Sequence, residues 1–295
     1  MLAFTWIALR FIHFISLMLV FGFAMYGAWL APVTIRRLLT KRFLRLQQYA
    51  AVWSLSSTTA IFAVQGGMMG TGWADVISPE IWQALLQTQF GGVWLWQIVL
   101  ALVTLTVALM QPGNMSRLLF MLTIAQFVLM AGVGHATLNE GLIAKVHQTN
   151  HAVHLICAAA WFGGLLPVIW CMRIVKGRWR HQAIHALMRF SWCGHFAVIG
   201  VLVSGVLVSG VLNVLFITGF SPTLATYWGQ LLLLKVVLVI IMVGIALANR
   251  YVLVPRMGQD EYRAAIWFVW MTKLEWVIGA VVLVIISLLA TLEPF

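Results

Sequence analysis

Three histidines, His147, His151 and His154, lie near the middle of this chain at spacings of four and then three residues. At about 100° per residue, this spacing puts all three imidazoles on one stripe of a helix. The stripe leads into an apolar run that is long enough to enter a membrane. Because imidazoles are expensive to keep in lipid, these residues indicate a metal, a haem iron, a proton path or a water-filled vestibule.

Other soft or nitrogenous side chains fall near the ends of apolar runs that we expect on the same side of the membrane. His13 lies two turns into the first run, Met68 and Met69 end the second run in QGGMMGTG, and His135 ends the fourth. Thioether sulfur favours Cu(I) and imidazole accepts either oxidation state of copper, whereas the near absence of carboxylates argues against Mg²⁺ or Ca²⁺. The predicted metal ligands are His13, Met68, Met69, His135, His147, His151 and His154.

Two charged residues, Lys235 and Glu275, lie inside apolar runs, where a charge is costly unless it is paired or lines a cavity. We predict either an ion pair between the last two membrane spans or a proton or ion relay. The three cysteines, Cys157, Cys171 and Cys193, lie in or beside apolar segments, and their odd number argues against a disulfide framework. They are interpreted as small buried apolar residues, with soft metal ligation as the alternative.

The composition predicts an integral membrane protein of the all-α class. The chain is 63% hydrophobic and only 8% charged, whereas soluble domains carry about 25% charged residues. A net charge of +11 would suggest nucleic acid as a partner of a soluble protein. Here it indicates basic loops on one side of a membrane, so we expect contact with membrane lipid and no nucleic-acid partner.

Runs of about 20 apolar residues predict eight transmembrane helices. The expected spans are 5–32, 49–72, 91–111, 118–136, 149–172, 190–218, 228–249 and 266–291. Most of the basic residues fall in the first, third, fifth and seventh loops between these spans. Since basic loops stay in the cytoplasm, both termini are expected on the outer, periplasmic side of a bacterial membrane.

The two halves of the chain look duplicated. The segment from Thr88 to Leu109 aligns without gaps on the segment from Thr226 to Leu247, and HFISLMLVFG from His13 resembles HLICAAAWFG from His154. We therefore predict two parallel four-helix repeats, residues 1–140 and 141–295, related by an axis along the membrane normal. In this alignment His13 corresponds to His154, and Gln97 to Lys235.

Motifs along essentially the whole chain resemble the copper resistance protein D family (CopD/PcoD type) of bacterial inner-membrane proteins. They are RFIHF near the start, HAVHLICAAAWFGGL in the fifth span, SGVLN in the sixth, TYWGQLLLLK in the seventh and LEW in the eighth. The resemblance implies copper homeostasis, commonly as copper uptake across the inner membrane, with a small periplasmic copper-binding protein of the C type as partner. It assigns no settled chemical role to the matching residues, which are His13, His151, His154, Trp161, Lys235 and Glu275.

A second likeness leads to another function. The His154 segment resembles the histidine-bearing first helix of HemJ-type protoporphyrinogen oxidases, which are haem-associated membrane proteins. Haem b needs one or two axial imidazoles, which His13 with His151 or His154 would supply. The sequence favours a copper transporter over an enzyme, with a haem-b redox protein that moves electrons across the membrane as the alternative. It leaves the oligomeric state open.

Overall fold

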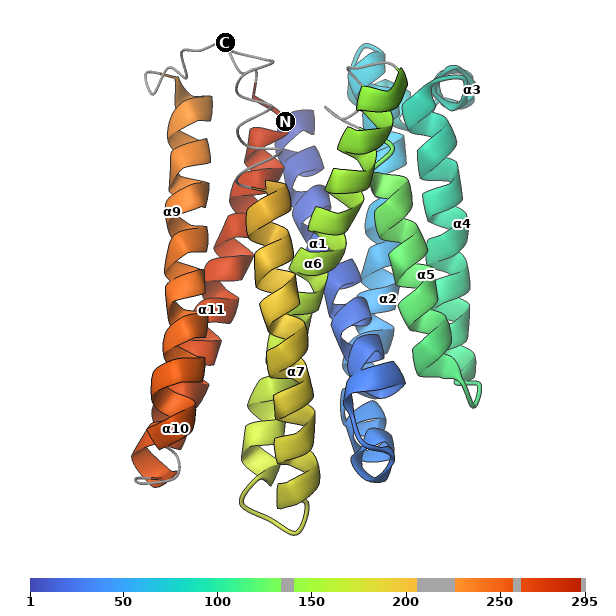
Figure 1. Cartoon of the computed structure of the whole chain (residues 1–295). Helices are drawn as coiled ribbons and strands as arrows, with labels where there is room; N and C mark the ends of the chain where they lie inside the picture. The colour runs from blue at the N-terminus through green and yellow to red at the C-terminus, as the bar shows by residue number, and fades with distance from the viewer. Residues whose placement is uncertain (134–140, 206–225, 257–260, 293–295) are drawn as a thin grey trace.

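The computed structural model describes residues 1–133, 141–205, 226–256 and 261–292, and every regular element in these ranges is a helix. The long helices run side by side along a common direction (Figure 1). The all-helical prediction is therefore confirmed for this part of the chain. A helix satisfies its backbone N–H and C=O groups internally, as a segment surrounded by lipid must.

The first group of helices forms a closed set of four. Its long members are α1 (Leu2–Met25), α2 (Val33–Met69), α4 (Gln89–Met110) and α5 (Met115–Met130). Helices α1 and α4 each contact both α2 and α5, so the four surround a shared interior. A π-helical turn, η1 (Tyr26–Leu30), extends α1, while η2 (Trp73–Ile77) and α3 (Pro79–Leu86) connect α2 to α4.

The second group follows the same order along the chain. Its long members are α6 (Gly141–Ile174), α7 (Arg180–Val201), α9 (Tyr227–Ala248) and α11 (Glu261–Leu289). Helix α6 contacts α7 and α11, and α11 contacts α9. A π-helical turn, η5 (Asn249–Leu253), and the short α10 (Val254–Arg256) lie between α9 and α11.

Six stretches of helix are long and apolar enough to cross a membrane, among the residues that the structure describes. They do not include α2, and α5 has only 16 residues. The basic stretch before the second predicted span, which we expected to be a loop, is instead the first part of α2. Lys and Arg are good helix formers, so the helix continues beyond its apolar section.

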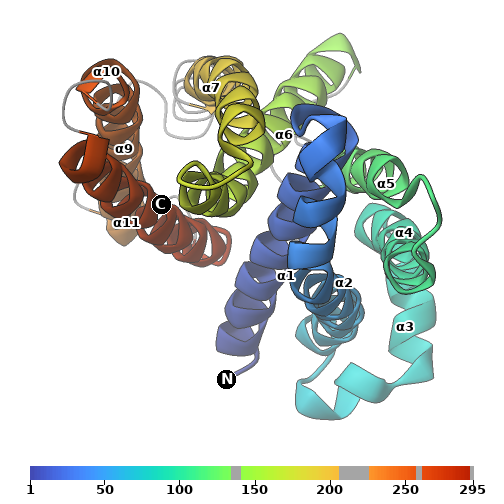
Figure 2. The ribbon, with the colours of Figure 1, turned by 90° about the horizontal axis from the view of Figure 1, so that it is seen from below.

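Helices α1 and α6 cross at the centre of the molecule (Figure 2). Their closest approach is at Gly22 and Gly163, where a Cβ atom on either glycine would overlap the backbone of the other helix. Small residues at such a crossing let two backbones come close and gain van der Waals contact. Around this crossing α11 packs on α1, and α5 packs on α6.

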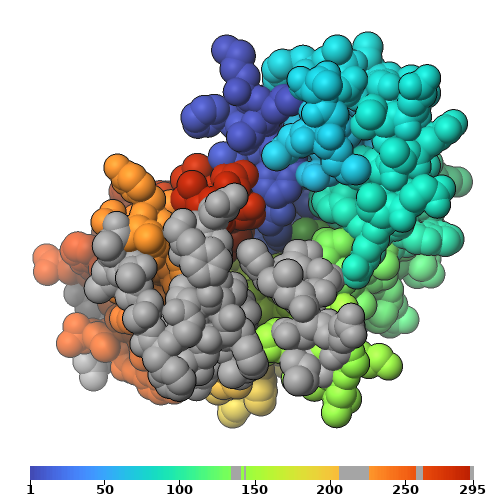
Figure 3. Space-filling model, turned by 90° about the horizontal axis from the view of Figure 1, so that it is seen from above, coloured from blue at the N-terminus to red at the C-terminus, as the bar shows by residue number. Residues whose placement is uncertain are grey.

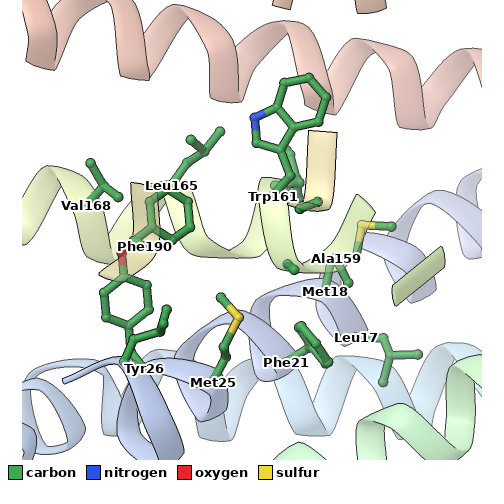
Figure 4. Close-up of a cluster of buried hydrophobic side chains, with 14 of the residues drawn as sticks. Leu17, Met18, Phe21, Met25, Tyr26, Ala159, Trp161, Leu165, Val168 and Phe190 are labelled. Carbon is green, nitrogen blue, oxygen red and sulfur yellow. The ribbon is translucent and has the colours of Figure 1, made fainter. Parts of the chain in front are cut away.

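The main buried cluster lies along the α1–α6 crossing (Figure 4). Leu17, Phe21 and Met25 of α1 are each at most 1% exposed, and Ala159 and Leu165 line the facing side of α6. Close packing of this kind holds α1 and α6 in one fixed rotation about their own axes. That rotation decides which way the polar side chains of these two helices point.

The start of α1 and the end of α11 lie at the same end of the bundle, which we call the upper end (Figures 1 and 3). Helices α4 and α9 also begin there. Each is capped by a threonine: Thr88 accepts a hydrogen bond from the Gly91 N–H at 3.0 Å, and Thr226 accepts one from the Gly229 N–H at 3.2 Å. Side-chain caps of this type satisfy backbone donors that the helix leaves unpaired.

Candidate functional site

His13 lies in the interior of the first helix group and is 1% exposed. At a rise of 1.5 Å per residue, it is about 17 Å below the start of α1. Its Nδ1 atom is 3.1 Å from Oγ1 of Thr58 on α2, and its Nε2 atom is 3.5 Å from Nε2 of Gln97 on α4. The imidazole therefore joins three helices of this group.

The hydroxyl of Thr58 determines which nitrogen of His13 carries the proton. Thr58 donates its only hydroxyl proton to the carbonyl oxygen of Ser54, at 2.6 Å. Its oxygen can then only accept, so the His13 Nδ1–H donates to it. The Nε2 atom of His13 is left with a lone pair that faces Gln97. Imidazoles that bind metals are held in the same way, by a hydrogen bond at the other ring nitrogen.

The surroundings of His13 contain buried polar atoms without a partner. The ring centroid of Trp94 lies 5.5 Å from that of His13, and the Arg10 guanidinium lies 4.5 Å from the centroid of Trp6. Among the described residues, no hydrogen bond reaches Nε of Arg10, Nε1 of Trp94 or Oε1 of Gln97. Buried polar groups are normally paired, so these atoms indicate a site that water or a polar guest enters.

His154 of α6 repeats this arrangement in the second helix group. Its Nδ1 atom is 3.2 Å from Oγ of Ser204, and that hydroxyl donates to the carbonyl oxygen of Gly200. By the same argument, Nδ1 carries the proton and Nε2 has the lone pair. Asn150 also donates to the Ser204 carbonyl, at 3.0 Å. A Cβ atom at Gly205 would overlap the imidazole, so the ring fills the space beside this glycine.

A basic side chain lies near each imidazole. Lys235 of α9 is within electrostatic range of His154, and Arg10 is within range of His13. Lys235 occupies the position that corresponds to Gln97 in the predicted repeat. A positive charge close to an imidazole weakens the binding of a cation there.

Glu275 of α11 is 2% exposed and accepts a hydrogen bond from Nε1 of Trp161, at 2.5 Å. The sequence predicts an ion pair or relay between Lys235 and Glu275. Among the described residues the hydrogen-bond partner of this carboxylate is the indole of Trp161. The ion pair and the relay both stay predictions.

The Trp161–Glu275 hydrogen bond gives a test of the second helix group. Trp161→Phe is expected to lower the free energy of unfolding by about 1.5–3 kcal/mol, because it leaves a buried carboxyl group unpaired. Trp276→Phe is a matched control, since its indole N–H has no partner in the described structure and its ring stacks on Phe162 at 5.5 Å. Thermal unfolding of both variants in detergent measures the difference. Equal losses of stability in the two variants would show that the Trp161–Glu275 hydrogen bond is not the source of the loss.

The remaining predicted ligands are spread along the upper part of the bundle. Met68 and Met69 end α2 and are 43% and 49% exposed. His147 and His151 are half-buried on α6, and His135 lies outside the described residues. No three His, Cys, Asp or Glu side chains come together as a metal-binding group in the part of the chain that is described. The predicted single His/Met cluster therefore stays a prediction, and the geometry brings out two separate imidazole sites.

The loop after Met68 and Met69 is held by one carboxylate. The N–H and the hydroxyl of Thr71 both donate to Asp75, the hydroxyl at 2.9 Å. These hydrogen bonds favour the charged form and hold the pKa of the Asp75 carboxyl below its usual value. The end of α2 is thereby fixed at neutral pH, with both thioethers accessible.

The haem alternative required His13 to face His151 or His154. The structure instead turns His13 toward α2 and α4, and His154 toward α7. Each imidazole belongs to its own helix group and has its own hydroxyl partner. Haem held between these rings therefore receives no support from their placement.

The hydroxyl groups that orient the two imidazoles were not predicted from the sequence. One face of α2 carries three of these hydroxyl residues, Ser54, Ser57 and Thr58, at positions i, i+3 and i+4. Their recurrence in the apolar segment WSLSSTTA was a usable signal. Ser204 had no such neighbours, so only its packing against His154 identifies it.

Comparison with known protein families and relatives adds an independent result. Residues 1–146 match the family described as copper resistance protein D-like, N-terminal domain, and residues 184–289 match copper resistance protein D. The chain is 84% identical to the inner membrane protein YebZ of Escherichia coli (strain K12) over 295 residues, which covers 100% of both chains. It is 32% identical to copper resistance protein D of Pseudomonas syringae pv. tomato over 304 residues, covering 98% of this chain and 96% of the relative. No solved structure matches.

Proposed function

Because the chain belongs to the copper resistance protein D family, we propose that it carries copper across the bacterial inner membrane, from the periplasm to the cytoplasm. The observation that carries this proposal is the pair of imidazoles, His13 and His154, each held inside a helix group with Nδ1 turned toward a hydroxyl group, so that Nε2 is the nitrogen that would bind the ion. Polar side chains in such positions are expensive unless they serve a guest. Copper, in this proposal, is the cargo of the protein.

The proposed topology has eight spans, formed by α1, α2, α4, α5, α6, α7, α9 and α11, with both termini in the periplasm. In this topology the upper end is periplasmic. Support comes from the basic residues Arg36, Arg37 and Lys41, which begin α2 at the opposite end. The positive-inside rule assigns that end to the cytoplasm.

The two-repeat arrangement, residues 1–140 and 141–295, is likewise part of the proposal. Gly22 and Gly163 occupy corresponding positions in the two repeats, and they contact each other. Contact between corresponding residues is what a two-fold axis through that point requires. The corresponding caps Thr88 and Thr226, and the two hydroxyl-bound imidazoles, also agree with it.

In the proposed mechanism, copper arrives at the upper end from a periplasmic copper-binding protein of the C type. The exposed thioethers of Met68 and Met69 are soft donors that would receive Cu(I). The imidazoles then offer nitrogen ligands deeper in the bundle. Repulsion from Arg10 and Lys235 keeps the copper ion at each imidazole only briefly. Conduction of an ion through several sites requires such weak binding at each of them.

The direct test uses the purified protein reconstituted in lipid vesicles. Cu(I) added outside is expected to accumulate inside, as measured by metal analysis of the washed vesicles, and protein-free vesicles are the control. Equal accumulation in both would contradict the proposal. The visible spectrum of the same reduced preparation tests the haem alternative, since haem b gives a Soret band with α and β bands.

A further inference from the structure

One stripe on the upper part of α7 and the turn after it, between residues 193 and 204, faces side chains with metal-binding atoms. The stripe consists of Cys193 and Gly200 of α7 and of Ser204, which lies just after the end of α7 at Val201. Their spacings of seven and four residues place them on one side. Ser204 contacts His154, and a Cβ atom at Gly200 would overlap Sγ of Cys157 on α6. One further step down the stripe, Cys193 contacts Met25 of α1.

The two sulfur atoms at the bottom of this stripe are close enough to share an ion. Sγ of Cys193 lies 3.9 Å from Sδ of Met25. With metal–sulfur bonds of about 2.3 Å, as for zinc thiolates, one ion would bind both at an angle of roughly 115°. That angle suits trigonal coordination and leaves a third position open.

A buried hydroxyl group without a partner lies at the same place. Tyr26, directly after Met25, is 1% exposed, and its hydroxyl makes no hydrogen bond to any described residue. It lies within electrostatic range of two thiols, those of Cys171 and Cys193. A thiolate at Cys193 would accept this O–H and so provide the missing partner. Outer hydrogen bonds of this kind orient and tune metal ligands.

On these contacts we propose that Cys193 and Met25 form a Cu(I)-binding site on the cytoplasmic side of His154. This inference rests on the proposed function, since it describes the next stop of the same cargo. Thiolate and thioether are the donors that select Cu(I). Binding breaks the S–H bond of Cys193 and forms a Cu–S bond, and the proton leaves to water.

Charge balance explains why a monovalent ion fits this position. Cu⁺ replaces one proton, so the loaded site has the same net charge as the empty one. A divalent ion would leave one uncompensated positive charge in a buried, largely apolar cluster, which is strongly unfavourable. The site is therefore expected to bind Cu(I) and to reject Zn²⁺.

The test measures Cu(I) binding to the purified full-length protein, in competition with a coloured Cu(I) chelator under anaerobic conditions. Cys193→Ser is expected to lose more than about 100-fold in Cu(I) affinity at this site, and Tyr26→Phe about 10-fold, following the usual effect of a lost outer hydrogen bond. X-ray absorption of the loaded wild type should show sulfur ligands. Met18→Leu, in the same buried cluster, is the matched control for Met25→Leu.

The possible outcomes separate this inference from the proposed function. Unchanged affinity in both Cys193→Ser and Met25→Leu, or ligation by nitrogen and oxygen alone, would overturn the sulfur site, while uptake by the wild type would still support transport. Sulfur-bound copper without any uptake would keep the site and overturn transport. Thermal unfolding of each copper-free variant shows whether the substitution has damaged the fold. If one of Cys193→Ser and Met25→Leu is damaged, the Cu(I) affinity of the other variant decides whether the sulfur site exists.

Discussion

Copper uptake into vesicles is expected to fall by more than about 100-fold when His13 and His154 are both replaced by Asn. The amide of Asn reaches about as far as Nδ1 of histidine, so it keeps a donor for Thr58 or Ser204 and removes only the Nε2 lone pair. The fold should therefore survive while the proposed ligand is lost. Uptake rates and the unfolding midpoint, measured on one preparation, separate the two effects.

The single variants show how the two imidazoles are connected. If the sites act in series, either replacement alone removes uptake and the double variant is no worse. If they serve parallel routes, each single variant keeps a substantial part of the rate. His181→Asn, at an exposed position in the first turn of α7, is the control and should leave uptake unchanged. Full uptake by the double variant would eliminate both imidazoles as ligands.

The second large effect is expected at the crossing of α1 and α6. Gly163→Val should lower the free energy of unfolding by at least about 3 kcal/mol, the upper end of the usual effect of overpacking. The reason is that the new Cβ would lie on the carbonyl group of Met18, which is part of a rigid helix and cannot move aside as a side chain can. The yield of monodisperse protein and its thermal unfolding in detergent measure this loss.

The control for Gly163 is a glycine in the same kind of helix with free space around it. Gly244 of α9 is exposed, and none of the described residues has an atom within 4 Å of the Cβ it would gain. Gly244→Ala is therefore expected to be neutral, or to stabilise the helix by about 0.5–1 kcal/mol. Equal stability of Gly163→Val and the wild type would show that the two backbones are not in contact.

Periodicity predicted the helices and motifs predicted the family, because both patterns depend only on the order of residue types along the chain. The histidines at 13 and 154 were found for the same reason. The Lys235–Glu275 ion pair was predicted from depth alone, and depth does not say which side of a helix a residue occupies. The partner of Glu275, Trp161, depends on how α6 and α11 pack, which no local pattern contains.

The basic stretch after α1 illustrates a different limit. Charge indicated the side of the membrane, and we took absence of apolar residues as absence of helix. Arg36 and Lys41 nevertheless lie within α2, since helix propensity does not require burial. In this chain a helix can therefore extend beyond the apolar run that it contains.

The hydroxyls that hold His13 and His154 also restrict what these rings can transmit. Relay of H⁺ along a hydrogen-bonded chain requires an imidazole to take up a proton on one nitrogen and release another from the opposite nitrogen. Thr58 and Ser204 both point their own hydrogens toward backbone carbonyls, so neither can pass one to the ring without first rotating. Proton exchange between either ring and its hydroxyl partner therefore requires that hydroxyl to rotate first, whereas copper binding at Nε2 does not.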